Sequence, residues 1–127
     1  MPSLKRKFGD AGEKIAEKYL IDKGYKILEK NFQRRWGEID IIAMIKKVIV
    51  FIEVKTRDAV FVSWYPPEAS VNYVKQMRLN KICTTYLCQK NYDAEQEWQL
   101  DVLAIAIDKI TKKARIRHIE NILRAKY

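Results

Sequence analysis

Three ionisable residues lie inside two strongly apolar runs of the sequence. The runs are adjacent in the stretch GEIDIIAMIKKVIVFIEVKTR, residues 37–57, with Asp40 in the first and Glu53 and Lys55 in the second. Burying an unpaired charge costs roughly several kcal/mol unless a partner or a metal compensates for the lost water. Two acids and a lysine placed in this way therefore indicate a site of chemistry as well as a core.

A β-hairpin would bring these three side chains together. If residues 39–45 pair with residues 48–55 around a two-residue Lys-Lys turn, facing residues have numbers that sum to 93, and Asp40 lies opposite Glu53. Lys55 shares the face of Glu53 because side chains alternate along a strand. Two facing carboxylates repel unless a cation lies between them, and Mg²⁺ prefers one or two carboxylate ligands. The spacing predicts a divalent-metal site.

Two alternatives remain open at this point. Lys-Lys is not the Asn-Gly or Asp-Gly sequence that two-residue hairpin turns prefer, and a bulge would shift the register by one residue. Glu53 and Lys55 would still share a face, although Asp40 would move away. An ExK pair at a strand end is also often an ordinary surface pair. The preceding run VIVFI, apolar on both faces, favours a central strand and so a buried position for the pair.

Further ionisable residues belong to other predicted elements. Glu13 borders the apolar stripe of the first predicted helix, so it is either a third carboxylate for the same cleft or a solvated helix residue. Asp101 lies in the apolar run WQLDVLAIAI, where we expect a structural partner for a basic group or the backbone. His118 is the only histidine of the chain, and we expect a surface residue.

The remaining pattern supplies the elements that would position these residues. Helical spacing of apolar residues from Phe8 to Leu20 is followed by Gly24 as a stop signal. A strand (YKILEKNF), the two apolar runs, a helix carrying Val74 and Tyr86, and two more strands (WQLDVLAIAI and ARIRHIENI) complete the order. We predict an α/β fold in which a small mixed sheet is flanked by helices.

Composition limits the class of protein. A chain of 127 residues fits a single domain, 1–127, and 48% hydrophobic with 32% charged residues is typical of a soluble protein. The formal charge of +9 favours a polyanionic partner, nucleic acid before anionic membrane. No run has the roughly 20 apolar residues of a membrane span, and no signal-type start is present, so we expect a cytoplasmic protein. Two cysteines without a CxxC motif support neither a disulfide framework nor a zinc site.

Four motifs in order carry a family resemblance. GDAGEKIAEKYLIDKGYKILEKNF, WGEIDIIA, VFIEVKTR and PPEASVNYVKQMRLNKICTTYL together resemble the YraN family, also called UPF0102. The chain also looks like the wider PD-(D/E)xK nuclease superfamily and, within it, archaeal Holliday junction resolvases. The resemblance implies a restriction-endonuclease-like αβββαβ core. The segment AVFVSWYPPEAS departs from the pattern, with Trp64 and Tyr65 where relatives have a shorter glycine-containing link.

The resemblance also implies roles for individual residues. Asp40 matches the first acid of the superfamily, Glu53 and Lys55 match its ExK element, and Glu13 matches the glutamate that resolvases supply from their first helix. Asp40, Glu53 and Glu13 would then hold Mg²⁺ or Mn²⁺, and Lys55 would position or deprotonate the attacking water.

The implied activity is metal-dependent hydrolysis of phosphodiester bonds, in DNA more than RNA, with branched or junction DNA of repair or recombination among the substrates. Resolvases act as dimers, so a homodimer would fit junction cleavage. The alternative is a nucleic-acid-binding protein that keeps the nuclease fold without catalysis. In either case the candidate contacts to nucleic acid are basic: Lys5, Arg6, Lys7, Arg34, Arg35, Arg57, Lys75, Arg78 and Lys81.

Overall fold

The computed structural model describes residues 4–59 and 73–123, and the departure at Trp64 and Tyr65 lies outside them. The elements, in chain order, are α1 (Leu4–Asp22), β1 (Lys26–Arg34), β2 (Gly37–Ile45), β3 (Val48–Asp58), α2 (Tyr73–Gln89), β4 (Trp98–Ile107) and β5 (Ala114–Ile119). This order confirms the predicted αβββαβ core, and β5 is the last edge strand that the sequence suggested.

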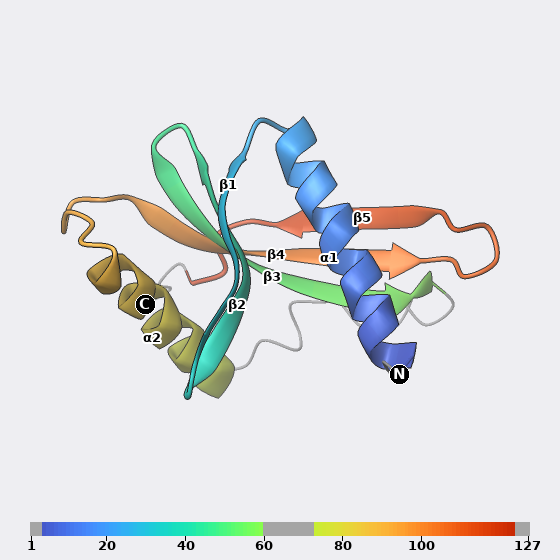
Figure 1. The fold of residues 1–127 in the computed structure, drawn as a ribbon, viewed down its shortest axis with the longest axis horizontal. Coiled ribbons are helices and arrows are strands. Elements are labelled where there is room, and N and C mark those ends of the chain that lie inside the picture. Colours follow the sequence, from blue (N-terminus) through green and yellow to red (C-terminus); the bar gives the residue numbers. More distant parts are fainter. Residues whose placement is uncertain (1–3, 60–72, 124–127) are drawn as a thin grey trace.

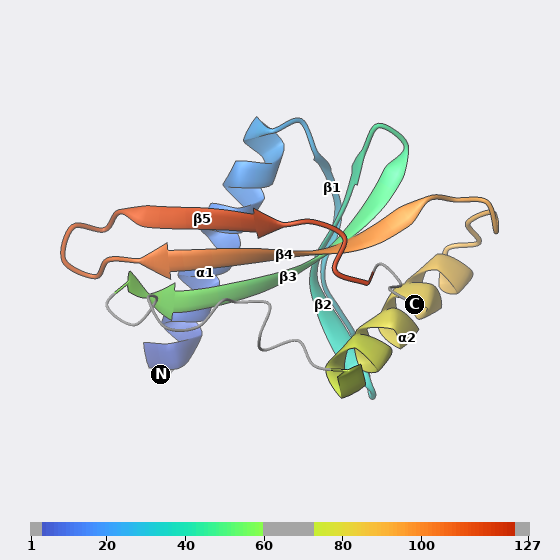
Figure 2. The ribbon, with the colours of Figure 1, turned by 180° about the vertical axis from the view of Figure 1, so that it is seen from behind.

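The five strands form one mixed sheet in the order β1-β2-β3-β4-β5. β3 and β4 are parallel, whereas the other neighbouring strands are antiparallel. A parallel pair needs a crossover connection, and α2 lies within that connection. Figures 1 and 2 show α1 running across one face of the sheet, in front of the strands in one view and behind them in the other.

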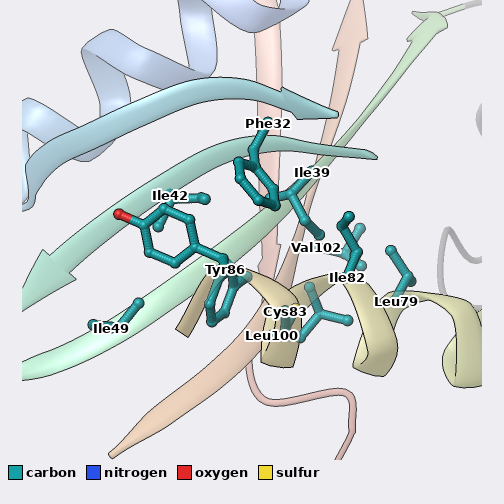
Figure 3. Close-up of a cluster of buried hydrophobic side chains, with 11 residues drawn as sticks. Phe32, Ile39, Ile42, Ile49, Leu79, Ile82, Cys83, Tyr86, Leu100 and Val102 are labelled. Atoms are coloured by element: carbon teal, nitrogen blue, oxygen red, sulfur yellow. The ribbon is translucent and has the colours of Figure 1, made fainter. Parts of the chain in front are cut away.

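Two hydrophobic cores cover the two faces of the sheet. One lies under α2, where Ile82 and Tyr86 pack against Phe51 and other strand residues (Figure 3). The other lies under α1, where Ala16 and Leu20 pack with residues of β2, β3 and β4. Phe51 belongs to the first core, and its sequence neighbours Val50 and Ile52 belong to the second. β3 is thus covered on both faces, as the run VIVFI predicted.

α1 ends where the sequence predicts. Gly24 has a φ of 96°, a conformation that glycine adopts readily. The amide of Gly24 donates to the carbonyl of Ile21, and the amide of Tyr25 donates to that of Leu20. These two bonds form a Schellman motif, which satisfies carbonyls that the helix end would leave without partners.

The β2–β3 hairpin has the predicted register. Its paired residues run from Ile41 with Ile52 to Ile45 with Val48, so their numbers sum to 93. Lys46 and Lys47 form the two-residue turn with φ values of 47° and 69°. Positive φ at both central residues is the geometry of a type I′ turn, which matches the twist of the strands. The bulge that would have shifted the register is not present in this hairpin.

Neither helix of the described ranges is long and apolar enough to cross a membrane.

Candidate active site at the β2–β3 hairpin

Asp40 lies one position beyond the last paired residues of the hairpin. The ladder ends at Ile41 and Ile52, the residues next to Asp40 and Glu53 in their strands. Beyond the ladder, the contact between the strands is made by a side chain: the amide of Val54 donates to Asp40 Oδ2 at 2.7 Å. The carboxylate of Asp40 is therefore held against β3.

The alternation of side chains between the two faces of β2 is broken at Asp40. Ile39 packs in the core under α2, and Ile41 packs in the core under α1. Residues two apart normally share one face of a strand, so the alternation is broken between them. The Asp40 carboxylate, which accepts from the amide of Val54, lies at this break in the alternation.

Glu53 and Lys55 lie side by side on β3. Lys55 Nζ is 3.9 Å from Glu53 Oε1, and the side chains are 22% and 14% exposed, respectively. An ion pair this far out of water is more than the ordinary surface pair that the sequence left open, because both charges have lost much of their hydration.

Glu13 approaches from α1. It is half-buried, and its side chain is hydrogen-bonded to Asn31 of β1. Its neighbour Gly12 lies against β3 so closely that a Cβ atom added there would be 1.9 Å from Thr56 Oγ1. Because Gly12 has no side chain, the helix backbone carrying Glu13 can contact the strand that carries Lys55.

The electrostatic environment links the three acids. Burial raises the pKa of Asp40 to about 7, and the negative charges of Glu53 and Glu13 also raise it, while the bond from Val54 acts in the opposite direction. Burial likewise raises the pKa of Glu13, and nearby acids add to that effect. A carboxylate whose ionisation is opposed by burial and by other carboxylates favours a bound cation.

The pKa of Lys55 is lowered, whereas those of Asp40 and Glu13 are raised. Burial lowers the pKa of its ammonium group, and a side-chain hydrogen bond with Lys75 and the charge of Lys75 also lower it, while Glu53 and Asp40 raise it. A lysine that gives up its proton more readily than usual can act as a general base.

Glu13, Asp40 and Glu53 are near one another but do not form a closed ligand set. Three donor atoms within 4.8 Å of one another occur, in the described ranges, at Asp101, His118 and Glu120 instead. Asp40 accepts a hydrogen bond from the amide of Val54, and Glu13 is hydrogen-bonded to Asn31. Their role as metal ligands stays a prediction, although hard carboxylate oxygens suit Mg²⁺ or Mn²⁺.

A cleft of about 570 Å³ opens beside Glu53 and Lys55, between the β1–β2 turn, β3 and α2. Asp40 and Glu13 are not among the described residues that line it. The lining is formed by Trp36, Gly37, Glu38, Glu53, Lys55, Val74, Lys75, Arg78, Leu79 and Ile82. Sequence reasoning did not single out Glu38 or Trp36. The Glu-Ile-Asp spacing in β2 could have indicated Glu38, whose charge also raises the pKa of Asp40.

The predicted nucleic-acid contacts occupy different positions. Lys75 and Arg78 line the cleft. Arg57 is half-buried on β3, and Arg35 is exposed in the β1–β2 turn. Arg34 hydrogen-bonds to Gln89 at the end of α2, and its guanidinium lies 4.3 Å from the ring centroid of Phe32.

Lys81 of α2 is exposed beside the cleft, with Nζ 4.9 Å from the ring centroid of Trp36. The side chains of Lys5, Arg6 and Lys7 lie outside those that the structure describes.

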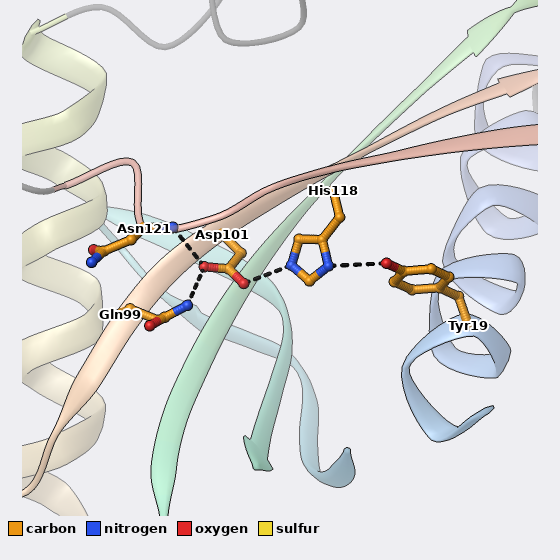
Figure 4. A network of polar contacts seen from close by, with 5 residues as sticks. All are labelled: Tyr19, Gln99, Asp101, His118 and Asn121. Carbon is orange, nitrogen blue, oxygen red and sulfur yellow. Dashed lines mark hydrogen bonds and ion pairs between the residues drawn. The ribbon is translucent and has the colours of Figure 1, made fainter. Parts of the chain in front are cut away.

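Asp101 has the structural role expected from the sequence. Its buried carboxylate accepts hydrogen bonds from the Gln99 amide at 2.9 Å and the Asn121 backbone at 2.8 Å, and Oδ2 lies 2.7 Å from His118 Nε2 (Figure 4). The Tyr19 hydroxyl lies 3.1 Å from the other ring nitrogen of His118. This network ties β5 to β4 and to α1.

The expectation that His118 is a surface residue is wrong. Its side chain is 13% exposed, because β5 pairs with β4 and directs the ring towards Asp101 and Tyr19. The partner acid is 17 residues earlier in the chain, so the spacing gave no signal for this contact. Together with Glu120, the pair also forms the acid and histidine group whose donor atoms could hold a metal ion.

The comparison with known families is clear. The sequence model described as "Uncharacterised protein family UPF0102" matches residues 12–105. The chain belongs to the UPF0102 family. This membership confirms the resemblance that the four sequence motifs carry, and the matched range contains Glu13, Asp40, Glu53 and Lys55.

Individual relatives match over nearly their whole length. A UPF0102 protein of Alkaliphilus oremlandii is 42% identical over 118 residues, covering 93% of this chain and 98% of the relative. One from Thermodesulfovibrio yellowstonii is 47% identical over 115 residues, covering 89% and 92%. Among solved structures, Pyrococcus furiosus SfsA in complex with Ca²⁺ is 18% identical with a TM-score of 0.43. That match covers 91% of this chain and 63% of SfsA.

Proposed function

We propose that this chain is a metal-dependent nuclease that hydrolyses phosphodiester bonds, with DNA as the preferred substrate. The observation that carries the proposal is the arrangement at the end of the hairpin. Glu53 and Lys55 line an open cleft, and Asp40 has a pKa raised by burial and by the neighbouring acids. Such shifts cluster at functional sites because catalysis needs groups poised near neutral pH.

The carboxylates supply the metal ligands. Asp40 and Glu53, with Glu13 directly or through water, would hold Mg²⁺ or Mn²⁺. The bound ion would lower the pKa of a water molecule and offset the negative charge that develops on the phosphate. The hydrogen bond from the Val54 amide to Asp40 Oδ2 would orient that carboxylate for such a role.

Lys55 provides the proton acceptor. Its lowered pKa and its place in the cleft wall suit removal of a proton from the attacking water. As the water oxygen bonds to phosphorus, the bond to the leaving oxygen breaks, and solvent returns a proton to that oxygen. Lys75 and Arg78, in the same wall, would hold the flanking phosphates.

The test is a cleavage assay on single-stranded, flapped, branched and duplex DNA with Mg²⁺ or Mn²⁺. We expect cleavage by the wild type and a loss of roughly 100-fold or more in Glu53→Gln and in Lys55→Ala. Glu95→Gln, in the exposed loop before β4, is the matched control and should cleave normally.

Two outcomes would count against the nuclease proposal. Cleavage that survives unchanged in both site variants would place the activity elsewhere. No cleavage of any substrate, together with no Mn²⁺ binding heat that depends on Asp40 and Glu53, would indicate a binding protein without catalysis.

A further inference from the structure

The cleft beside Glu53 has an apolar side as well as a charged one. Lys55, Lys75 and Arg78 suit phosphates, whereas Trp36, Val74 and Leu79 offer no group that a phosphate could use. Contacts to the backbone of a duplex come mainly from basic and polar side chains. The apolar side of the cleft therefore suits a part of the substrate other than its phosphates.

Trp36 is the one aromatic side chain among the described residues that line the cleft. It lies in the turn between β1 and β2 and is 40% exposed, although burying an indole ring away from water is favourable. The Lys81 ammonium group, from α2, lies 4.9 Å from the ring centroid. This cation steadies the ring at the rim while much of its surface stays open.

The backbone beside Trp36 also approaches α2. A Cβ atom on Gly37 would lie 3.9 Å from the Cβ of Ile82, within ordinary van der Waals contact. Val74, 54% exposed on α2, lines the same cleft. The aromatic ring and an aliphatic side chain thus share a cleft with the acid and lysine of the proposed nuclease site.

We propose that Trp36 stacks an unpaired nucleobase next to the phosphate that is cleaved. The inference rests on the nuclease function proposed above and names its substrate class: nucleic acid with unpaired bases at the cut, as in single strands and flaps. A base in a continuous duplex has both faces covered by its neighbours, so it cannot lie on the ring. Stacking on aromatic side chains accepts any base, because each base has a π face.

The test measures DNA binding by fluorescence anisotropy in EDTA, where metal-dependent cleavage does not occur. Trp36→Ala should bind single-stranded and flapped DNA about 5-fold to 100-fold more weakly, while duplex binding changes less than about twofold. Trp36→Phe should keep most of the affinity because it keeps an aromatic face. Met77→Ala is the control, since Met77 is 56% exposed on α2 but outside the described cleft lining.

The outcomes separate this inference from the nuclease proposal. Equal losses on single strand and duplex, no loss in Trp36→Ala, or no binding of single strands by the wild type would each overturn the stacking role. Cleavage of duplex DNA that is unaffected in Trp36→Ala would overturn it too, while leaving the nuclease function intact. Selective loss of single-strand binding in a protein that cleaves nothing would support the stacking role and refute the nuclease.

Discussion

Asp40 holds its proton near neutral pH because burial and the charges of Glu53 and Glu13 oppose ionisation. Ionising Asp40 therefore costs more free energy in the folded protein than in the unfolded chain, where the same carboxyl group has its ordinary pKa of 3.8. The folded state binds more protons than the unfolded state between about pH 4 and pH 7. Stability from this group is therefore present at low pH and is lost as the pH rises towards 7.

Asp40→Asn should remove this pH dependence from the metal-free protein. An asparagine keeps an oxygen that can accept the Val54 hydrogen bond, but it cannot ionise. Relative to the wild type, the variant should gain roughly 1–3 kcal/mol in free energy of unfolding between pH 4.5 and pH 8. Urea denaturation in EDTA at the two pH values measures the difference.

The control for Asp40 is an acid outside the site. Asp93→Asn changes an exposed loop residue whose carboxylate accepts a local hydrogen bond from the amide of Glu95. The difference from the wild type should then be the same at both pH values. An Asp40→Asn difference that also does not vary with pH would show that this carboxyl ionises normally in the folded chain.

The residues that could be predicted from sequence are those fixed by strand periodicity. Glu53 and Lys55 share a face because they are two apart, and counting across the hairpin gave the register as far as Ile41 and Ile52. The bond from Val54 to Asp40 could not be foreseen, because it lies where the regular alternation along β2 is broken. Trp36 was missed for a different reason: a tryptophan in a basic turn has no periodicity to interpret.

At the level of elements, α1 packs closely against β3 at Gly12. Gly12→Ala should destabilise the protein, because its new Cβ would be 1.9 Å from Thr56 Oγ1 and the helix or strand would have to shift. We expect a loss of roughly 1–3 kcal/mol, the usual cost of overpacking. Urea denaturation measures this loss, and the cleavage assay should show lower activity because Glu13 moves with the helix.

Gly9 offers the matched substitution within the same helix. A Cβ atom there would meet nothing within 4 Å, and alanine is the better helix former by up to about 1 kcal/mol. Gly9→Ala should therefore be neutral or stabilising. If both variants lose stability equally, the contact with Thr56 is not the reason why alanine at position 12 destabilises the protein.

The Lys46-Lys47 turn shows why elements were easier to predict than their connections. The apolar runs on either side fixed the register, since a slip by one residue would exchange the side chains that pack under α1 with those that pack under α2. Nothing in the two lysines indicated positive φ at both positions. The strands imposed a conformation on the turn that its own residues do not favour.

At the scale of the whole molecule, the formal charge of +9 should govern association with nucleic acid. Each phosphate neutralised by a lysine or arginine releases counterion, so log Kobs should fall linearly with log salt concentration. Arg78→Gln, in the cleft wall, should make that slope shallower by roughly 0.7–0.9. Anisotropy titrations at several salt concentrations give the slope directly.

Arg115→Gln removes the same charge from a different place. Arg115 is exposed on β5 and is not among the described residues that line the cleft. For this variant, the slope of log Kobs against log salt concentration should match that of the wild type if binding is confined to the cleft. Equal changes in both variants would mean that attraction is spread over the surface, and a flat salt response in the wild type would argue against nucleic acid as a partner.

The parallel ladder between β3 and β4 has a consequence for synthesis of the chain. Ile49 pairs with Trp98, so at typical translation rates β3 would emerge from the ribosome about 2–10 s before the strand that completes it. During that interval the nascent hairpin would present an apolar edge to other unfinished chains. Glu53 and Lys55 interrupt that edge with charge, which discourages intermolecular pairing. The residues proposed for catalysis would thus also act as gatekeepers against aggregation before the sheet is complete.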